Sequence, residues 1–429
     1  MKNWFSTASA ASRAVFAIWA FALVAIFIRV GIAHQHSVYP NYELAANFWR
    51  HGIPLYQENK QTPNGFVYSP LVAAFFVPLA LLPDLAGEVL WRLLSVAVCM
   101  AAIRRWLETA GRRFLEPRQE ALFYLLLLPL FLGNINNGQA NILLIGLLVW
   151  AVVGAYSGTQ KALADAKGAA SGAWWLSALC VALATYLKVY PLVAGLLLLL
   201  VYPGKFGLRF FVSLAGLFLL SLVLQHPAYV QDQYQMWIST RLNEDRHLFS
   251  QESLPHDLFL LLNYLHLRVN ESGYVVVRLV SGALVAAMCL RGRLRKWPEG
   301  YQLNQLLALS CTWLLLCGPA SESSTYVLMA PSVLLELFYC FSARVAPWRR
   351  VWMGLVALCY FGSFTIKTLL PLRDPGWMCL QPGSALLFLC YLAARTWPDE
   401  TEFRDEDKPR GKIREEKEEC LAGSGPGIH

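Results

Sequence analysis

The sequence predicts an all-α membrane protein that crosses the bilayer many times. Of its 429 residues, 56% are hydrophobic and only 15% are charged, whereas soluble chains usually carry about 25% charged residues. The apolar residues gather in runs, and a helix needs roughly 20 of them to cross a bilayer. These runs extend from residue 14 to residue 394, so they leave no room for a large separate soluble domain.

Twelve apolar runs are predicted to be transmembrane helices. The first follows Lys2 and Arg13 and is too long for the core of a secretory signal, so we interpret it as a retained span, with cleavage as the alternative. A further run, 71–82, is interrupted by Pro78 and is too short to cross, which predicts a re-entrant or interfacial helix after the first extracytoplasmic loop. The twelve predicted spans are 14–33, 86–104, 119–133, 139–156, 172–187, 189–202, 206–224, 272–290, 301–317, 325–341, 351–369 and 377–394.

The positions of the basic residues predict the orientation of these spans, because loops rich in Lys and Arg stay in the cytoplasm. With the N-terminus inside and 71–82 not crossing, the arginine-rich segment 104–118 and the basic run 291–296 both lie on the cytoplasmic side. If 71–82 crossed, segment 104–118 would lie outside, so we exclude that count. We therefore expect a multi-pass protein of the cytoplasmic (inner) cell membrane with both termini in the cytoplasm.

Composition divides the chain into one transmembrane domain, 1–397, and a tail, 398–429, whose low apolarity predicts a disordered cytoplasmic segment. The formal net charge of +8 comes from bases between apolar runs, which is typical of cytoplasmic loops and not of a nucleic-acid-binding surface. The ten cysteines lie mostly within or at the ends of apolar runs and form no CxxC pair. We therefore expect neither a disulfide framework nor a metal site.

Six polar stretches fall on the extracytoplasmic side of this topology, and we infer that they line a single cavity. A simpler interpretation is that their Asn and Gly residues only turn the chain and that Lys188 only extends to lipid headgroups. Arg92 and Arg278 lie inside predicted spans, where an ionisable group indicates function unless it pairs with another buried polar group. The stretches are 34–69, 133–144, 186–191, 225–257, 318–326 and 371–377.

The first loop contains a predicted short helix, 41–50. Its apolar side chains recur at helical spacing, while Glu43, Asn47 and Arg50 share the opposite side. Gly52 follows as a residue that commonly ends a helix. We expect this helix to lie on the membrane surface beside the cavity, with Tyr42, Ala45, Ala46 and Trp49 on its apolar face.

Several motifs within about the first 200 residues resemble those of glycosyltransferase family 87, the polyprenyl-phosphate-mannose-dependent α-mannosyltransferases with a GT-C membrane fold. The similar segments are YELAANFWRHGIPLY, 42–56, and FVYSPLVAAFFVPLALLP, 66–83. Gly138, Gln139 and Asn141 match a G-Q-x-N element, and Lys188 with Pro191 matches a K-x-x-P element. The order and spacing of these motifs agree with the family.

The resemblance implies a GT-C-like bundle that transfers a hexose, expected to be mannose, on the outer face of the membrane. The donor would be a polyprenyl-phosphate sugar in the lipid bilayer, and the acceptor a hydroxyl of a lipid-linked or other glycan. Such a transfer needs a base for the acceptor proton and a cationic or hydrogen-bonding site for the departing phosphate. It needs no nucleotide, so we expect no cofactor, and the sequence has neither a Rossmann glycine fingerprint nor a P-loop.

The sequence departs from the family at the presumed base, an aspartate placed just after the first span. Residues 34–39 contain no acid. Glu43 is our first candidate as its substitute, His36 is chemically able because histidine titrates near pH 6.5, and Glu322 is the third choice. The missing aspartate leaves open that the chemistry is altered or lost.

The other candidate residues follow from the same motifs. For the donor phosphate we favour Lys188, with Arg241, Arg246 and His256 of the long loop as partners. Substrate contacts are assigned to Tyr42, Tyr68, Asn137, Gln139 and Asn141.

Two other functions remain. One is a lipid-sugar flippase or transporter, which would need polar groups near the bilayer midplane, and the other is a catalytically inactive relative that acts as a binding protein.

Overall fold

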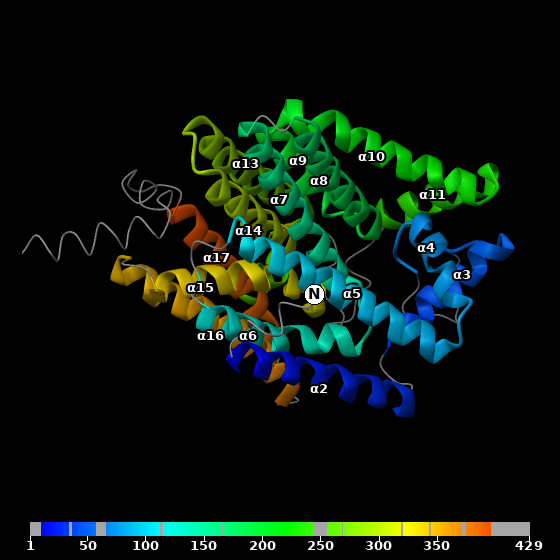
Figure 1. Ribbon diagram of the computed structural model, residues 1–429, viewed down its shortest axis with the longest axis horizontal. Helices are drawn as coiled ribbons and strands as arrows, with labels where there is room; N and C mark the ends of the chain where they lie inside the picture. The colour runs from blue at the N-terminus through cyan, green and yellow to red at the C-terminus, as the bar shows by residue number, and fades with distance from the viewer. Residues whose placement is uncertain are drawn as a thin grey trace, which may run out of the picture.

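The protein is a bundle of helices, with α2 (Ala10–Ala33) along one side and α10 (Pro203–Leu224) and α11 (Pro227–Leu242) along another (Figure 1). Every secondary-structure element among the described residues is helical, which confirms the all-α prediction. The predicted tail, 398–429, lies outside the described residues. The computed structural model describes residues 10–33, 37–56, 66–111, 115, 117–164, 167–242, 255–267, 269–318, 321–342, 345–369 and 375–395.

Each predicted span falls on a helix, and α4 (Pro70–Ala80) coincides with the run that was predicted not to cross. Two spans begin with a short 3-10 segment that continues into an α-helix. Besides α2 and α10, the span helices are α5 (Asp84–Glu108), α6 (Pro117–Asn136), α7 (Asn141–Leu163), α8 (Lys167–Leu187), α9 (Leu192–Val201), α13 (Glu271–Leu294), α14 (Glu299–Cys317), η3 (Ser323–Met329) with α15 (Ala330–Ser342), α16 (Pro347–Leu369), and η4 (Pro375–Cys379) with α17 (Leu380–Arg395).

Helix lengths refine the predicted number of crossings. Within the described part of the chain, eight helices are long and apolar enough to cross a membrane. Four of the predicted spans are not among these eight. Three of them, α6, α14 and α16, carry charged or amide residues near their ends, which makes them less apolar. The fourth, α9, has ten residues and is therefore about 15 Å long, roughly half the thickness of the hydrocarbon core. A crossing at α9 therefore has to include the non-helical residues that precede it.

The first loop forms the short helix that its pattern predicts, α3 (Tyr39–His51). The predicted apolar face is buried, and α3 packs against α4. Gly52 ends the helix with a φ of 66° and donates its N–H to Trp49 O, a conformation that favours glycine. The helix α11, which is distant in the sequence, contacts the same loop: Leu55 N donates to Gln233 Oε1 at 2.7 Å.

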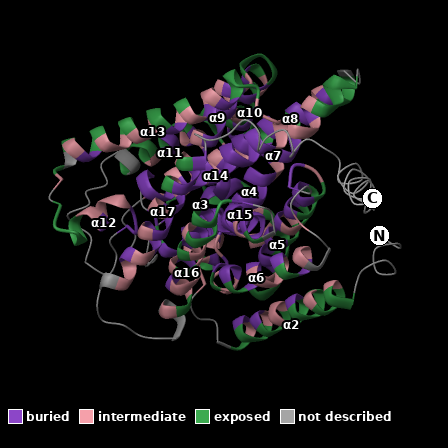
Figure 2. Ribbon diagram, turned by 90° about the vertical axis from the view of Figure 1, so that its left-hand side faces the viewer, coloured by how far each residue is buried: buried purple, intermediate pink, exposed green. Residues whose placement is uncertain are grey.

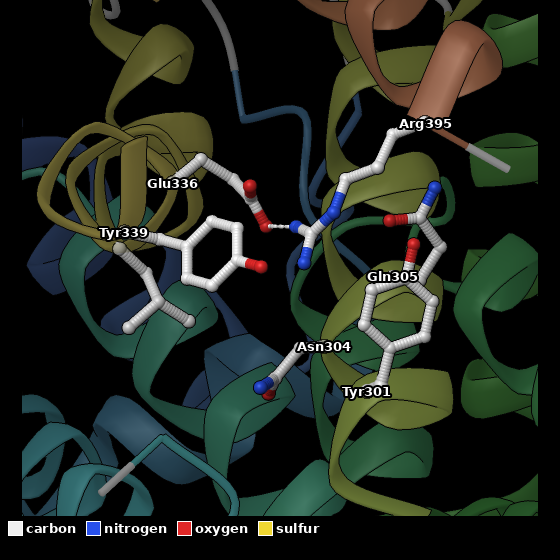
Figure 3. Close-up of a pocket in the computed structure, with 7 residues that line it drawn as sticks. Tyr301, Asn304, Gln305, Glu336, Tyr339 and Arg395 are labelled. Carbon is white, nitrogen blue, oxygen red and sulfur yellow. Dashed lines mark hydrogen bonds and ion pairs between the residues drawn. The ribbon is translucent and has the colours of Figure 1, made fainter. Parts of the chain in front are cut away.

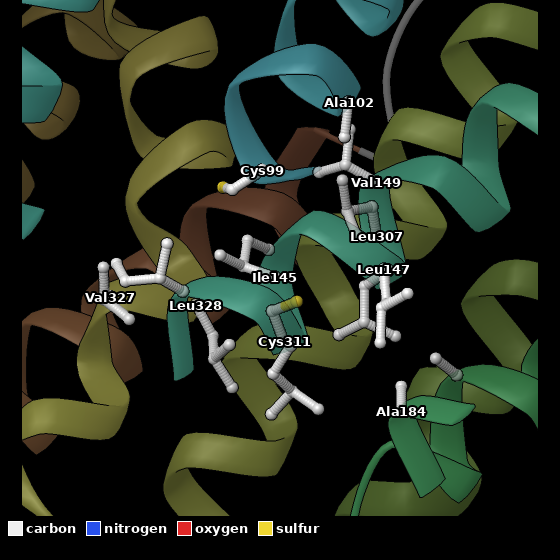
Figure 4. Packing of buried hydrophobic residues seen from close by; sticks show 14 of the residues in the cluster. Cys99, Ala102, Ile145, Leu147, Val149, Ala184, Leu307, Cys311, Val327 and Leu328 are labelled. Atoms are coloured by element: carbon white, nitrogen blue, oxygen red, sulfur yellow. The ribbon is translucent and has the colours of Figure 1, made fainter. Parts of the chain in front are cut away.

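The centre of the bundle is α7, whose span is 78% buried, whereas the spans of α2 and α13 are each only 17% buried. Figure 2 shows this contrast between the inner helices and the outer faces of α2 and α13, which are apolar and suited to lipid. Small residues allow close helix contact in membranes. A Cβ at Gly146 of α7 would lie 2.7 Å from Cys99 Cα of α5, in the region of tight packing that Figure 4 shows around Cys99 and Ile145.

A buried ion pair joins the last helix to the bundle. Arg395 at the end of α17 pairs with Glu336 of α15, and its guanidinium lies between the rings of Tyr301 and Tyr339, at 4.6 and 4.8 Å from their centroids (Figure 3). Both charged residues are buried, with exposed fractions of 5% and 7%. The arrangement connects α14, α15 and α17 at the end of the bundle where α17 terminates.

Candidate active site

The polar stretches of the sequence come together at the opposite end of the bundle. Val38 N, at the start of the first-loop helix, donates to Asn137 O at 2.9 Å. Asn134 Nδ2 at the end of α6 donates to the Ser324 carbonyl of η3 at 2.9 Å. His256 N donates to Ser321 O at 2.7 Å. Segments that lie far apart in the sequence therefore meet in one polar region, and the single cavity inferred from the pattern stays a prediction.

Lys188 lies inside this polar region. It follows the last residue of α8, and its Nζ donates to Asn141 Oδ1, the first residue of α7, at 2.9 Å. The ammonium group also lies 5.6 Å from the centroid of the Tyr190 ring. Asn141 is fully buried and is fixed in turn by Asn134, whose Oδ1 accepts from Asn141 Nδ2 at 3.1 Å. Lys188 therefore bonds to a buried amide, which differs from a lysine that only extends to headgroups.

A chain of hydrogen bonds connects Lys188 to a carboxylate. Asn141 Nδ2 donates to Gln139 Oε1 at 2.8 Å, and Ser324 Oγ donates to the same oxygen at 2.8 Å. Ser324 Oγ also lies 3.1 Å from Glu322 Oε2, and Gln139 Nε2 lies 3.5 Å from that carboxylate oxygen. A cation and an anion are thus held in one network at the end of an apolar bundle, with three amide and hydroxyl side chains between them.

Two tyrosines from the first loop border the network. Tyr42 OH donates to Tyr68 OH at 2.7 Å, and the Ala140 backbone N–H bonds to Tyr42. Burial raises the pKa of Tyr68, the positive charge of Lys188 acts in the opposite direction, and Glu322 raises it further. Tyr68 is therefore close enough to both charged groups to respond to them, and it lies at the edge of the same site.

Glu43 lies on a different side of α3 from Tyr42, beside two other acids. Burial raises the pKa of the Glu43 carboxyl, and the charge of Asp84, a hydrogen bond with Asp84 and the charge of Glu88 raise it further. The same surroundings raise the pKa of Tyr39 to about 12, with burial as the largest cause. The two acid candidates thus occupy separate environments: Glu322 in the Lys188 network and Glu43 in a cluster of carboxylates.

The remaining candidates are distributed more widely. His256 is buried, with Nδ1 2.9 Å from Gln381 Oε1 of α17, and it supports the backbone next to η3. Asn137 contributes its carbonyl to Val38 N and accepts a side-chain bond from Asn136 at 3.2 Å. His36 and Arg246 lie outside the described residues, as does the side chain of Arg241.

Three residues that bond to the network or contact Lys188 were not predicted from the sequence as site residues: Asn134, Ser324 and Tyr190. Ser324 stands in the stretch 318–326, which was selected for its polarity, but nothing in the sequence distinguishes it from the neighbouring serines. Tyr190, two residues after Lys188, resembles an ordinary interfacial aromatic residue in the sequence.

Among the described residues, no group of three or more His, Cys, Asp and Glu side chains is placed to hold a metal ion. The network offers instead a cation for an anionic leaving group and a carboxylate for a proton.

Comparison with known proteins assigns the family. The model of glycosyltransferase family 87 matches residues 66–319. Comparison with curated proteins gives no match. Among solved structures, ArnT from Cupriavidus metallidurans in the apo state is similar with a TM-score of 0.45 and 16% identity, over 90% of this chain and 78% of that one. The same protein bound to undecaprenyl phosphate gives a TM-score of 0.40 and 14% identity, with the same coverage. Because the family match covers more than half of the sequence, the chain belongs to glycosyltransferase family 87 and is a membrane glycosyltransferase.

Proposed function

We propose that the protein transfers a hexose, mannose in the first instance, from a polyprenyl-phosphate donor to an acceptor hydroxyl on the extracytoplasmic side of the membrane. The observation that carries the proposal is the hydrogen-bonded network between Lys188 and Glu322. The donor is lipid-borne, so it can enter between helices from the bilayer. A GT-C-like arrangement, with the site at one membrane face, is part of this proposal.

In this mechanism Lys188 holds the phosphate of the donor. The acceptor oxygen attacks the anomeric carbon, and the bond between that carbon and the phosphate oxygen breaks with its electron pair on the phosphate. Negative charge therefore develops where the Lys188 ammonium lies, and a preorganised cation there lowers the barrier. Tyr42, Tyr68 and Gln139 provide hydrogen-bonding groups for the sugar and the phosphate beside Lys188.

Glu322 is the base that the geometry favours, because it belongs to the same network as Lys188. As the acceptor oxygen bonds to the sugar, its proton passes to the Glu322 carboxylate. Glu43 is the alternative base, because burial and its acidic neighbours raise the pKa of its carboxyl toward neutral pH, where a base works best. His36 stays a further candidate base. Proposed partners for the donor phosphate are Arg241, Arg246 and His256, and proposed substrate contacts include Asn137 and Asn141.

Transfer can be measured with purified protein in lipid nanodiscs, polyprenyl-phosphate mannose as donor and a membrane lipid extract as acceptor. The wild type is expected to release polyprenyl phosphate and to label an acceptor. Lys188→Ala is expected to lower kcat/KM by roughly 100-fold, as for a lost charge-stabilising donor. Glu322→Gln, which removes the base but keeps the shape, is expected to lower kcat by roughly 100-fold or more.

Glu43→Gln serves as the matched comparison, because it neutralises the other acid candidate. Full activity in Lys188→Ala and Glu322→Gln would refute the assignment of the site, and loss only in Glu43→Gln would move the base to α3. Movement of the donor between leaflets without transfer would favour a flippase. Donor binding without either reaction would favour an inactive binding protein.

A further inference from the structure

The turn that carries Gln139 and Asn141 is fixed from outside by a buried arginine of α5. The last carbonyls of a helix have no partner within the helix and need donors from elsewhere. At the end of α6 and in the turn after it, four consecutive carbonyl oxygens each accept such a donor. The bonds run from Arg92 Nε to Ile135 O at 2.8 Å, from Arg92 Nη2 to Asn136 O at 2.8 Å, from Val38 N to Asn137 O at 2.9 Å, and from Trp91 Nε1 to Gly138 O at 2.7 Å.

Arg92 is a costly residue in this position. It is 1% exposed in the middle of a predicted span, where a charge is expensive unless it is paired. Glu88, one turn earlier in α5, pairs with it at 3.0 Å, and Ser37 Oγ accepts from Nη2 at 3.2 Å. The planar guanidinium can bond to two adjacent carbonyls and to a carboxylate at the same time, which the single ammonium of lysine cannot do with the same geometry.

The backbone of the turn lies directly against this guanidinium. Gly138 has a φ of +64°, and a Cβ there would lie 3.2 Å from Arg92 Cζ. Beneath the turn is a small cavity lined by residues that include Ser95 and Gln139, so packing alone does not fix the turn from that side. The position of the turn therefore depends on the donors of Arg92 and Trp91, together with Val38 N and the turn's own backbone bonds, such as Gln139 N to Asn134 O at 3.0 Å.

We propose that Arg92 is a positioning residue of the transfer reaction, and that it acts by fixing the turn from which Gln139 and Asn141 reach Glu322 and Lys188. This inference rests on the proposed function. Gln139 Oε1 accepts from both Asn141 and Ser324. A displaced turn would therefore break the hydrogen-bonded connection between the Glu322 carboxylate and the Lys188 ammonium. Arg92 itself touches neither group in the described network and affects the reaction only through the turn.

The first test measures the turn without any assay of activity. In Arg92→Lys, hydrogen–deuterium exchange of the peptide that covers residues 135–141 is expected to be at least about 10-fold faster than in the wild type, because opening the turn exposes its amides. The control is Arg278→Lys, at another arginine within a predicted span, whose Cζ lies 6.0 Å from the centroid of the Tyr274 ring. Unchanged exchange in Arg92→Lys, or an equal change in Arg278→Lys, would overturn the proposal.

The second test links the turn to catalysis. Arg92→Lys is expected to lower kcat by roughly 100-fold, as for a displacement of about 1 Å in a site. Gln139→Ala is also expected to lower kcat, and the kcat of the double variant should be no lower than that of the less active single variant, because both substitutions act on one network.

The two tests separate the two proposals. Faster exchange with a wild type that shows no transfer would contradict the proposed function but leave Arg92 as the residue that fixes the turn. Faster exchange with lower activity, but with additive effects of the two substitutions on kcat, would mean that Arg92 only stabilises the fold. That result would overturn the positioning role.

Discussion

The two acid candidates show how much the surroundings of one residue determine its chemistry. In the sequence, Glu43 and Glu322 are both acids in polar stretches on the same predicted side of the membrane. In the structure, Glu322 belongs to the network of Lys188, while Glu43 faces Asp84 and Glu88. The residue types and their positions in the chain made both acids candidates for the catalytic base. The helical spacing already predicts that Tyr42 and Glu43 face different sides of α3, and only the packing of α3 shows that Glu43 meets Asp84 and Glu88.

Glu43 should make stability depend on pH. Its pKa is higher in the folded protein than the ordinary value, so the folded state binds more protons, and stability falls as pH rises through the folded pKa. Glu43→Gln should therefore raise Tm at pH 7 by about 1–2 °C, because the group is only partly buried, and should have little effect near pH 4.

This prediction is measured by thermal unfolding of the purified protein between pH 4 and pH 8. The exposed Asp232 on α11 gives the control Asp232→Asn. A Glu43→Gln variant that is equally stabilised at pH 4 and pH 7, or that is less stable than the wild type at pH 7, would refute the proposed influence of Asp84 and Glu88.

Among the elements, α3 and α9 show opposite limits of sequence reasoning. The helix α3 was predicted together with its buried face and its terminal glycine, because these features depend on local spacing. The short length of α9 was not predicted, because the apolar run 189–202 was read as one span although Pro191 within it is a possible start of the helix. The reason is tertiary: residues 188–191 turn Lys188 toward Asn141 of α7.

The attachment of α17 should depend on the buried pair of Glu336 and Arg395. Glu336→Leu leaves the arginine charge buried without this carboxylate between two tyrosine rings, and should destabilise the protein by about 3–5 kcal/mol. The double variant Glu336→Leu with Arg395→Met removes both charges and should recover most of that stability, because apolar replacements of buried pairs are often neutral.

Denaturant unfolding of the wild type, of Glu336→Leu and of the double variant tests this prediction. The control pair is Arg104 and Glu108, which bond at 3.0 Å but are about half and 39% exposed, so Glu108→Leu should cost less than about 1 kcal/mol. A double variant as unstable as Glu336→Leu alone would show that the pair contributes specific contacts and not only mutual neutralisation.

At the scale of the whole molecule, the two charged networks described above lie at opposite ends of an apolar bundle. The network of Lys188 and Glu322 occupies one end, and the pair of Glu336 and Arg395 occupies the other. The distribution of Lys and Arg predicts that the second end is cytoplasmic. The helix α13 connects the two ends, so its flanking residues report the orientation directly.

We expect a membrane-impermeant maleimide to label Leu267→Cys but not Leu294→Cys in intact cells. Both positions are exposed, at 55% and 71%, and they flank the two ends of α13. The background should lack Cys390, which is exposed, and Cys420 of the tail. Labelling of Leu294→Cys alone would invert the topology and refute an extracytoplasmic site, and permeabilised cells provide the control in which both positions react.

The sequence by itself determined the all-helical membrane class, the short apolar helix that follows the first loop, the helix of the first loop and the family, because apolar periodicity, helix-ending glycines and short motifs are local properties of the chain. The tertiary structure decided which polar residues meet. Asn134, Lys188 and Ser324 are far apart in the sequence and become neighbours only when α6, α8 and η3 pack around α7. The role of Arg92 belongs to the same class, since its partners Ile135 and Asn136 are determined by the packing of α5 against the turn and not by any pattern in α5.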